Sequence, residues 1–162
     1  LRVVLLRDTG APLAPFNAWQ IIQGLETVGL RMKQHCANAE KVVTFLETQK
    51  KVTNVIYPTN HQGEIKERAL KYMKGGYGSL VGMDVGTKEN GAKFIDNLKM
   101  LYHVANIGDA RSLAIHPATT THSQLNDKEL LAAGVTPGYV RLSIGIEHPD
   151  DIIADIKQAL AA

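Results

Sequence analysis

The residue best suited to bind a ligand is Arg141. It lies in a short segment in which apolar residues alternate with tyrosine, arginine and serine along the chain. In a strand, alternate side chains point to opposite faces. One face would carry Val140, Leu142 and Ile144, and the other would carry Tyr139, Arg141 and Ser143. A guanidinium group in such a strand needs a partner, because burying its charge unpaired is costly, and it can hold a carboxylate through two parallel hydrogen bonds. Arg141 therefore indicates a carboxylate-binding site. The alternative is that Arg141 lies on the solvent-exposed face of a strand whose other face is buried.

A second candidate is Asn106, which ends an expected extended segment and precedes the turn at Gly108 and Asp109. An asparagine side chain can both donate and accept hydrogen bonds, so it can orient a small ligand. Asparagine and glycine are also ordinary turn formers. Binding of a ligand and formation of a turn therefore both remain open for Asn106.

Three further motifs indicate structure rather than chemistry. The glycines of residues 75–79 follow an expected helix and lead into an expected strand, whereas a dinucleotide-binding loop follows a strand and opens a helix. The six histidines show no metal-ligand spacing, so no metal site is expected, and His116 and His122 are expected to form local hydrogen bonds within one polar loop. Cys36, the only cysteine, lies on an apolar helix stripe and is expected to be buried and inert.

Composition excludes several classes of function. The chain has 162 residues and a net charge of +2 without a basic stripe, so nucleic acid is not an expected partner. No apolar run approaches the roughly 20 residues that span a bilayer, so no membrane partner is expected either. A single cysteine allows no intrachain disulfide, which is typical of a reducing, cytoplasmic setting.

The elements that would position Arg141 and Asn106 form a mixed pattern of helices and short strands. Residues 1–14 carry the turn signal Asp8-Thr9-Gly10 and are predicted to be irregular. Hydrophobic spacing predicts helices over residues 15–28, 30–46, 63–73, 90–101 and 127–133 and from residue 149 to the end, with Pro15 and Pro149 at two of the starts. The apolar faces of the first three helices are predicted to include Ile22 and Leu25, Leu30 and Met32, and Ile65 and Leu70, respectively. Hydrophobic spacing also predicts extended segments over residues 52–57, 79–85, 103–107, 112–115 and 139–146. The fold class that follows is α+β, with a small, mainly antiparallel sheet covered by helices on one side.

Three groups of motifs, in the same order along the chain, resemble the PLP-dependent enzymes of cysteine and methionine metabolism, the cystathionine γ-synthase-like family. The first group includes Ala14-Pro15-Phe16-Asn17-Ala18-Trp19 and Gly24-Leu25-Glu26-Thr27, the second Asn106-Ile107-Gly108-Asp109-Ala110 and Ile115-His116-Pro117-Ala118-Thr119, and the third Val140-Arg141-Leu142-Ser143-Ile144-Gly145-Ile146-Glu147. Within the family, the O-acetylhomoserine sulfhydrylase branch is the most similar.

This resemblance implies the carboxy-terminal domain of PLP fold type I, preceded by connecting helices, in a homotetramer whose active sites are shared between subunits. Arg141 matches the arginine that binds the α-carboxylate of the amino-acid substrate. Asn106 matches another carboxylate contact, although the family's usual residue there differs. The lysine segment that binds PLP has no counterpart in this chain, so the resemblance implies no catalytic and no cofactor-binding residue here, and no PLP bound to this chain alone.

The same resemblance divides the chain into a linking segment (1–14), connecting helices (15–50) and a carboxy-terminal α+β domain (51–162). It implies that an amino-terminal PLP-binding domain is missing, which agrees with a first residue, Leu1, that is not methionine. The expected reaction of the parent protein is conversion of O-acetylhomoserine and sulfide into homocysteine and acetate. The alternative is a free-standing module that binds or senses an amino acid or another small carboxylate.

Overall fold

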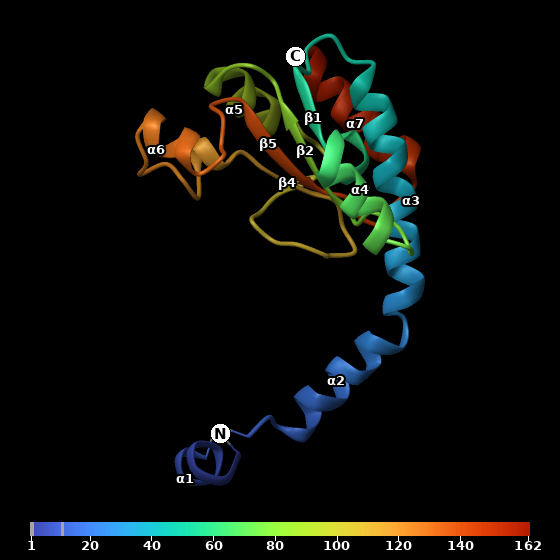
Figure 1. Cartoon of the computed structure of the whole chain (residues 1–162), viewed down its shortest axis with the longest axis vertical. Helices are drawn as coiled ribbons and strands as arrows, with labels where there is room; N and C mark the ends of the chain where they lie inside the picture. Colours follow the sequence, from blue (N-terminus) through green and yellow to red (C-terminus); the bar gives the residue numbers. More distant parts are fainter. Residues whose placement is uncertain (1, 11) are drawn as a thin grey trace. The chain divides into compact units, whose positions relative to one another are not determined.

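The computed structural model describes residues 2–10 and 12–162. The chain forms two compact units, Leu1–Arg31 and Met32–Ala162, each with its own internal contacts. Figure 1 gives the order of their elements along the chain.

The first unit is helical almost throughout. It contains η1 (Arg2–Leu6), α1 (Arg7–Thr9) and α2 (Pro15–Glu26), so the predicted irregular link over residues 1–14 is wrong for residues 2–9. The turn signal at Gly10 is a helix end instead, because this glycine adopts the left-handed conformation (φ 66°) that commonly closes a helix. Pro15 opens α2 as predicted.

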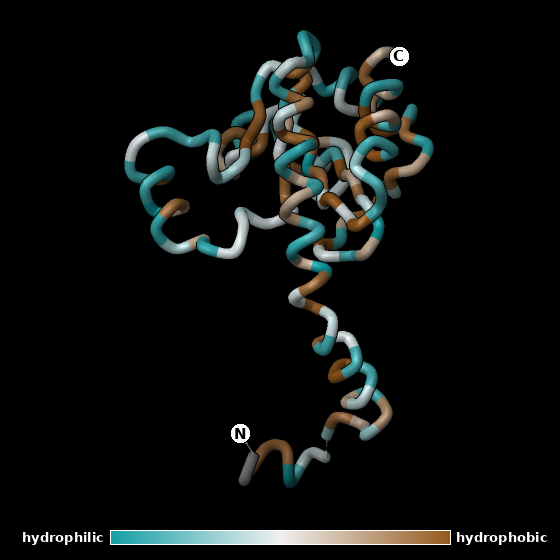
Figure 2. Tube along the Cα trace, turned by 90° about the vertical axis from the view of Figure 1, so that its right-hand side faces the viewer, coloured by the Kyte–Doolittle hydropathy of each residue, from teal (hydrophilic) through white to brown (hydrophobic). Residues whose placement is uncertain are grey.

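Apolar side chains of α2 find no core within this unit, since none of its residues is buried. Trp19 and Ile22 are 55% and 53% exposed. Figure 2 shows hydrophobic positions, in brown, interspersed with hydrophilic ones along this part of the chain. The predicted helical stripe is thus present, but the described residues of the first unit do not cover it.

The next helix, α3 (Val28–Glu47), supplies one wall of the core of the second unit. The break before it falls at Thr27 rather than at the predicted Gly29. Its buried residues are His35, Cys36, Asn38, Ala39, Val42, Val43 and Leu46. Leu30 and Met32, which were predicted on the same stripe, are exposed. Because α3 buries this face within the second unit, that compact unit begins at Met32.

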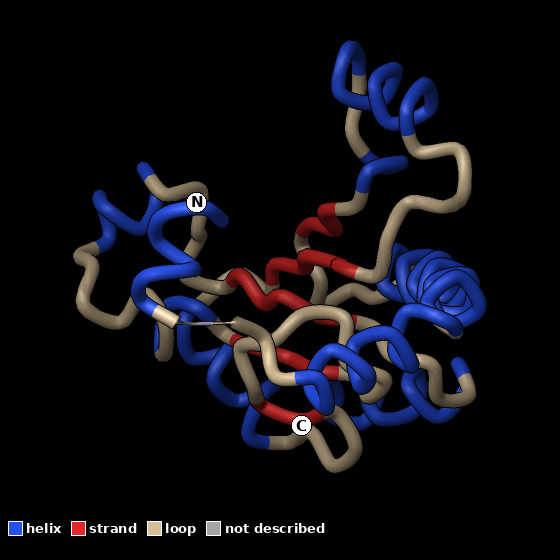
Figure 3. The backbone as a smooth tube through the Cα atoms, turned by 90° about the horizontal axis from the view of Figure 1, so that it is seen from below, coloured by secondary structure: helices blue, strands red, loops and turns tan. Residues whose placement is uncertain are grey.

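A five-stranded sheet forms the centre of the second unit (Figure 3, strands in red). Its strands are β1 (Asn54–Ile56), β2 (Leu80–Asp84), β3 (Tyr102–His103), β4 (Leu113–Ile115) and β5 (Tyr139–Ser143), in the spatial order β1-β2-β5-β4-β3. All neighbouring pairs are antiparallel except β3 and β4, which are parallel. The prediction of a small, mainly antiparallel sheet is confirmed.

Helices α3, α5 (Lys88–Asp96) and α7 (Pro149–Ala161) pack on one face of this sheet and share one hydrophobic core with it. The remaining elements are η2 (Pro58–Asn60), α4 (Gly63–Tyr72), η3 (Pro117–Thr119) and α6 (Asp127–Ala132). No helix among the described residues is long and apolar enough to cross a membrane.

Helix α5 ends at Asp96, although hydrophobic spacing predicted helix as far as residue 101. The cause lies in α7, where the Asp155 carboxylate accepts hydrogen bonds from the backbone N–H groups of Lys99, Met100 and Leu101 at 2.9–3.0 Å. A carboxylate that satisfies three successive donors replaces the helical partners of that turn. The end of α5 is therefore decided by a contact from a distant helix.

Candidate functional site

Arg141 lies in the middle of the central strand β5, between two neighbouring strands. It is paired with Gly82 of β2 on one side and with Ile115 of β4 on the other. Val140, Leu142 and Ile144 are fully buried in the core. Tyr139 and Arg141 are half-buried on the opposite face of the sheet, as the alternation of the sequence predicts.

The guanidinium group of Arg141 is only partly satisfied. Its Nη2 donates to the backbone carbonyl oxygen of Asn106 at 3.2 Å. Its Nε is buried and has no hydrogen-bond partner among the described residues. No carboxylate in the described part of the chain forms a salt bridge with it either. A buried cationic donor without a partner is unfavourable, so this group is arranged for an acceptor that the described residues do not supply.

A pocket of about 540 Å³ opens beside this guanidinium. It is lined by Ile56, Tyr57, Pro58, His61, Ile65, Arg68, Ala69, Tyr72, Met73, Leu80, Val81, Gly82, Tyr139 and Arg141. Apolar walls with a few polar groups are typical of small-molecule sites. The two cationic residues of the lining, Arg68 and Arg141, favour an anionic ligand. Arg68 already pairs with Glu64, which leaves Arg141 as the group with free donors.

Gly82 makes room in this pocket for the ring of Tyr139. A Cβ atom at residue 82 would lie 2.7 Å from Tyr139 Cε2 and 3.1 Å from Ile56 Cβ, which is closer than atoms pack. Burial raises the pKa of the Tyr139 phenol, and the positive charge of Arg141 offsets part of that rise. A neutral tyrosine side chain therefore lies on the same sheet face as the arginine.

Asn106 lies near Arg141, but only its backbone contacts the guanidinium in the described structure. Its side chain is exposed and has no hydrogen bond among the described residues. The two predicted site residues are thus brought together across 35 positions of sequence. A role of the Asn106 side chain in ligand binding stays a prediction.

Several residues that fix this region were not singled out as site candidates in the sequence. Ser143 accepts a hydrogen bond from the backbone N–H of Gly108 at 3.3 Å. Behind it, Glu147 accepts from the backbone and the hydroxyl of Ser112 at 2.6 and 2.9 Å. The two-residue period of the strand could have identified Ser143, because it places Ser143 on the same face as Arg141. No local sequence pattern indicates that Glu147 binds Ser112.

Two of the residues interpreted as structural, His116 and Cys36, are buried in the second unit. His116 is buried and hydrogen-bonds through Nδ1 to the hydroxyl of Thr119 and through Nε2 to the carbonyl of Pro137. Burial lowers the pKa of His116, and the hydrogen bond to Pro137 counteracts part of this effect. Cys36 is buried, with Gly76 packed closely against it. Among the described residues, no three His, Cys, Asp or Glu side chains gather as metal ligands would.

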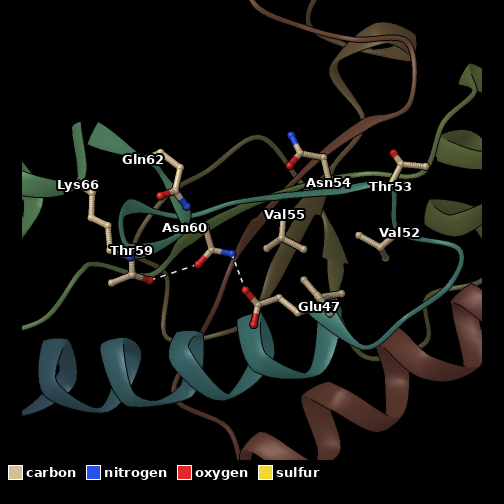
Figure 4. A pocket seen from close by; sticks show the side chains of 10 residues that line it. Glu47, Val52, Thr53, Asn54, Val55, Thr59, Asn60, Gln62 and Lys66 are labelled. Atoms are coloured by element: carbon tan, nitrogen blue, oxygen red, sulfur yellow. Dashed lines mark hydrogen bonds between the residues drawn. The ribbon is translucent and has the colours of Figure 1, made fainter. Parts of the chain in front are cut away.

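A second hollow, of about 470 Å³, lies at the outer edge of β1 and differs in chemistry from the Arg141 pocket. Figure 4 shows its side chains, and its central polar groups already bind one another. Asn60 donates to Glu47 at 2.9 Å and accepts from Thr59 at 3.3 Å. Donors and acceptors that are paired internally offer less to a ligand, so the Arg141 pocket is the better candidate site.

Known proteins similar to this chain match nearly all of it. An O-acetyl-L-homoserine sulfhydrylase of Leptospira meyeri is 51% identical over 161 residues, which are 98% of this chain and 36% of that protein. An O-acetyl-L-homoserine sulfhydrylase of Thermus thermophilus is 45% identical over 99% of this chain and 38% of its own length. The chain therefore spans a little over one third of these curated relatives.

The fold has a close counterpart among solved structures. A crystal structure from Campylobacter jejuni, described as an O-acetylhomoserine (thiol)-lyase with a pyridoxyl-lysine monophosphate, superimposes with a TM-score of 0.89 at 43% identity, over 99% of this chain and 38% of that one. This agreement confirms the predicted α+β fold class of a PLP-dependent enzyme. The family model for Cys/Met metabolism PLP-dependent enzymes matches residues 2–161. The chain therefore belongs to the PLP-dependent enzymes of cysteine and methionine metabolism.

Proposed function

We propose that this chain is the carboxy-terminal portion of an O-acetylhomoserine sulfhydrylase, which replaces the acetate of O-acetylhomoserine with sulfide to form homocysteine. In this proposal the chain contributes the site for the substrate α-carboxylate. Support comes from relatives that carry this activity in their names and match nearly all of the chain. The observation that carries the role of Arg141 is its buried Nε, which has no partner among the described residues.

Arg141 would bind the carboxylate through Nε–H and a second guanidinium N–H. A fork of parallel donors matches the two oxygens of a carboxylate. The bond from Nη2 to the Asn106 carbonyl turns the guanidinium and leaves Nε for the ligand. The largely apolar walls of the pocket beside it would lower the local dielectric constant, which strengthens the charge-assisted bonds. Held in this way, the carboxylate fixes the orientation of the substrate Cα–H bond.

PLP supplies the electron sink of this reaction when it is bound. The residues around Arg141 do not fit a Schiff base with PLP, because no lysine lines the pocket. The lysines of the second unit are exposed, apart from the partly buried Lys66 at the other hollow. We therefore propose that the reactive lysine belongs to the part of the relatives that this chain does not match. Incubation of the chain with PLP followed by borohydride should yield no stoichiometric adduct at one lysine.

The proposed partners of the chain are that further part of the protein and neighbouring subunits. The side chains of Phe16, Trp19 and Leu25 on α2 are exposed by 55–64%. Large apolar groups that stay exposed on one helix commonly mark an interface. In the proposed protein these residues contact the PLP-binding part or a neighbouring subunit.

The test of this function is Arg141→Lys in the full-length protein. Lysine keeps the charge but loses the planar fork, so one of the two carboxylate hydrogen bonds is lost. One charge-assisted bond contributes roughly 1.5–3 kcal/mol, so kcat/KM should fall by about 10- to 100-fold. Most of the loss should appear in KM, because the carboxylate is held in ground and transition states alike.

The control is the PLP content, which should stay at the wild-type level because Arg141 contacts substrate rather than cofactor in this proposal. Steady-state kinetics with O-acetylhomoserine and sulfide measures the effect. Near-normal kinetics in Arg141→Lys, or loss of PLP in place of a higher KM, would show that Arg141 is not the carboxylate anchor.

A further inference from the structure

Residues 105–109, which carry Asn106, form an exposed segment with few attachments to the rest of the unit. Its side chains are exposed, with Ile107 56% accessible. The ends on either side are held by backbone bonds, from Val104 N–H to the Ala114 carbonyl at 3.2 Å and from Ile146 N–H to the Ala110 carbonyl at 2.9 Å. Nothing in this arrangement by itself fixes the five residues between those ends.

Two side chains of β5 attach this segment to the sheet. Arg141 donates to the Asn106 carbonyl at 3.2 Å, and Ser143 accepts from the Gly108 N–H at 3.3 Å. Among the described residues, the one other hydrogen bond between residues 105–109 and the rest of the chain is local, from the Arg111 N–H to the Asp109 carboxylate at 3.1 Å. One of the two residues is thus the proposed carboxylate anchor, and the other lies two positions further along the same strand face.

The conformation of the segment depends on Gly108. Its φ of 76° lies in the left-handed region that side chains other than glycine rarely adopt. This turn aims the N–H of Gly108 at Ser143 and places the Asn106 carbonyl two residues earlier over Arg141. The Ser143 bond and the Arg141 bond are therefore linked through three consecutive residues of backbone.

Ser143 is suited to an anchoring role because it is rigid and nearly inaccessible. It is 1% exposed and pairs with Leu80 on one side and Leu113 on the other. A hydroxyl acceptor held in a central strand has little freedom to move. The segment, by contrast, has few contacts of its own, which is the property of backbone that opens locally at low cost.

We infer that Ser143 is a positioning residue for the Arg141 site: its hydroxyl holds residues 105–109 so that the Asn106 carbonyl orients the guanidinium. The inference rests on the proposed role of Arg141 in carboxylate binding. When the segment is detached, the guanidinium loses the acceptor that turns Nε toward the ligand. Substrate then has to order both the segment and Arg141 as it binds, and this ordering weakens binding.

The experiment replaces Ser143 with alanine in the full-length protein with its cofactor. Backbone hydrogen exchange over residues 105–109, measured by mass spectrometry, should become about 10-fold faster, because one of the two hydrogen bonds that attach the segment to β5 is lost. The KM for O-acetylhomoserine should rise about 3- to 10-fold while kcat stays within 2-fold, as expected for one neutral hydrogen bond. Ser143→Thr, which keeps the hydroxyl, should restore much of both properties.

Ser79→Ala is the matched control. Ser79 is also a buried serine, 7% exposed, beside the same sheet, but its hydroxyl makes no hydrogen bond to residues 105–109. Loss of the Ser79 hydroxyl should leave both the hydrogen-exchange rate of residues 105–109 and the KM for O-acetylhomoserine unchanged. Equal effects of Ser79→Ala and Ser143→Ala would overturn the inference, because both would then report general loosening of the sheet.

A double-mutant cycle separates positioning from structural support. If Ser143 acts through Arg141, Ser143→Ala should change KM by less than about 1.5-fold once Arg141 is alanine, although it still accelerates exchange. Unchanged exchange in Ser143→Ala would overturn the positioning role whatever the kinetics. A different result would contradict the proposed function: a normal KM in Arg141→Lys would show that Arg141 does not bind the substrate carboxylate.

Discussion

The two faces of the central sheet differ in whether their side chains are fully packed and hydrogen-bonded. On the helix-covered face, Val140, Leu142 and Ile144 are fully buried against α3, α5 and α7. On the other face, Arg141 retains a buried donor without a partner among the described residues. Strand β5 therefore packs into the core on one face and carries a donor without a partner among the described residues on the other, because alternate residues of a strand point to opposite faces.

The largest expected effect is on the covered face, from Leu142→Ala. Leu142 is completely buried, and truncation of such a leucine costs about 3–5 kcal/mol through lost burial and the cavity left behind. Urea unfolding followed by circular dichroism should show this loss. A decrease of less than about 1 kcal/mol in the free energy of unfolding would mean that the helix-covered face is not the more tightly packed of the two.

Gly82→Ala should have the next largest effect, this time on the open face. The new methyl group would overlap the Tyr139 ring, since the Cβ position lies 2.7 Å from Cε2. Displacing a packed aromatic ring costs roughly 1–3 kcal/mol, and the ring should move within the Arg141 pocket. Fluorescence or NMR signals of Tyr139 report the movement, and Gly82→Ala combined with Tyr139→Ala should recover part of the lost stability.

Acid should destabilise the second unit first through His116. Burial lowers the pKa of His116 below its usual value near 6.5, so the unfolded chain binds the proton more readily. Stability from the neutral ring is complete above that value and is lost as the pH falls from about 6.5 toward the lowered pKa. Unfolding midpoints between pH 7.5 and 5 measure this loss, and a flat profile would contradict it.

Asp155 should add a second loss at lower pH. Burial by itself raises the pKa of this carboxyl, but hydrogen bonds from the backbones of Leu101, Met100 and Lys99 and from Gln158 outweigh it and lower the pKa. The stabilisation is present above the unfolded value near 3.9 and disappears as the pH falls through the lowered folded value. Asp155→Asn should remove this acid step while leaving the step of His116 in place.

The smallest expected effect is from Arg141→Met, and its sign is opposite. Methionine fills a similar volume without a buried donor, so the chain should gain up to about 1 kcal/mol of stability. The same substitution should abolish tight carboxylate binding in the full-length protein. A clear loss of stability in urea unfolding would show that Arg141 also supports the fold.

Much of the fold was accessible from local patterns. The alternation around Arg141 predicted which residues of β5 face the core, and Pro15 and Pro149 predicted the starts of α2 and α7. These features depend on side-chain periodicity and on the backbone of proline, which are properties of neighbouring residues. The family was likewise accessible, because its motifs are contiguous in sequence.

Errors arose where a distant group decided the outcome. Asp155 of α7 ends α5 early, and Ile65 and Leu70 of α4 stay exposed although the helical spacing predicted that they face inward. Local propensity is a weak guide at such positions, since tertiary contacts override it. A further error is local: residues 2–9 form helix, and the turn signal at Gly10 marks the end of that helix.

The sequence by itself determined that Arg141 has a donor to offer on the less buried face of a strand, and that the chain belongs among proteins with the same ordered motifs. Only the tertiary structure decided that Nε of Arg141 has no partner among the described residues, that the Asn106 backbone rather than its side chain contacts the guanidinium, and that Ser143 accepts a hydrogen bond from the Gly108 N–H. Period and composition describe residues that are neighbours in the chain. The state of one hydrogen-bond donor depends on atoms that folding brings together from 35 positions away.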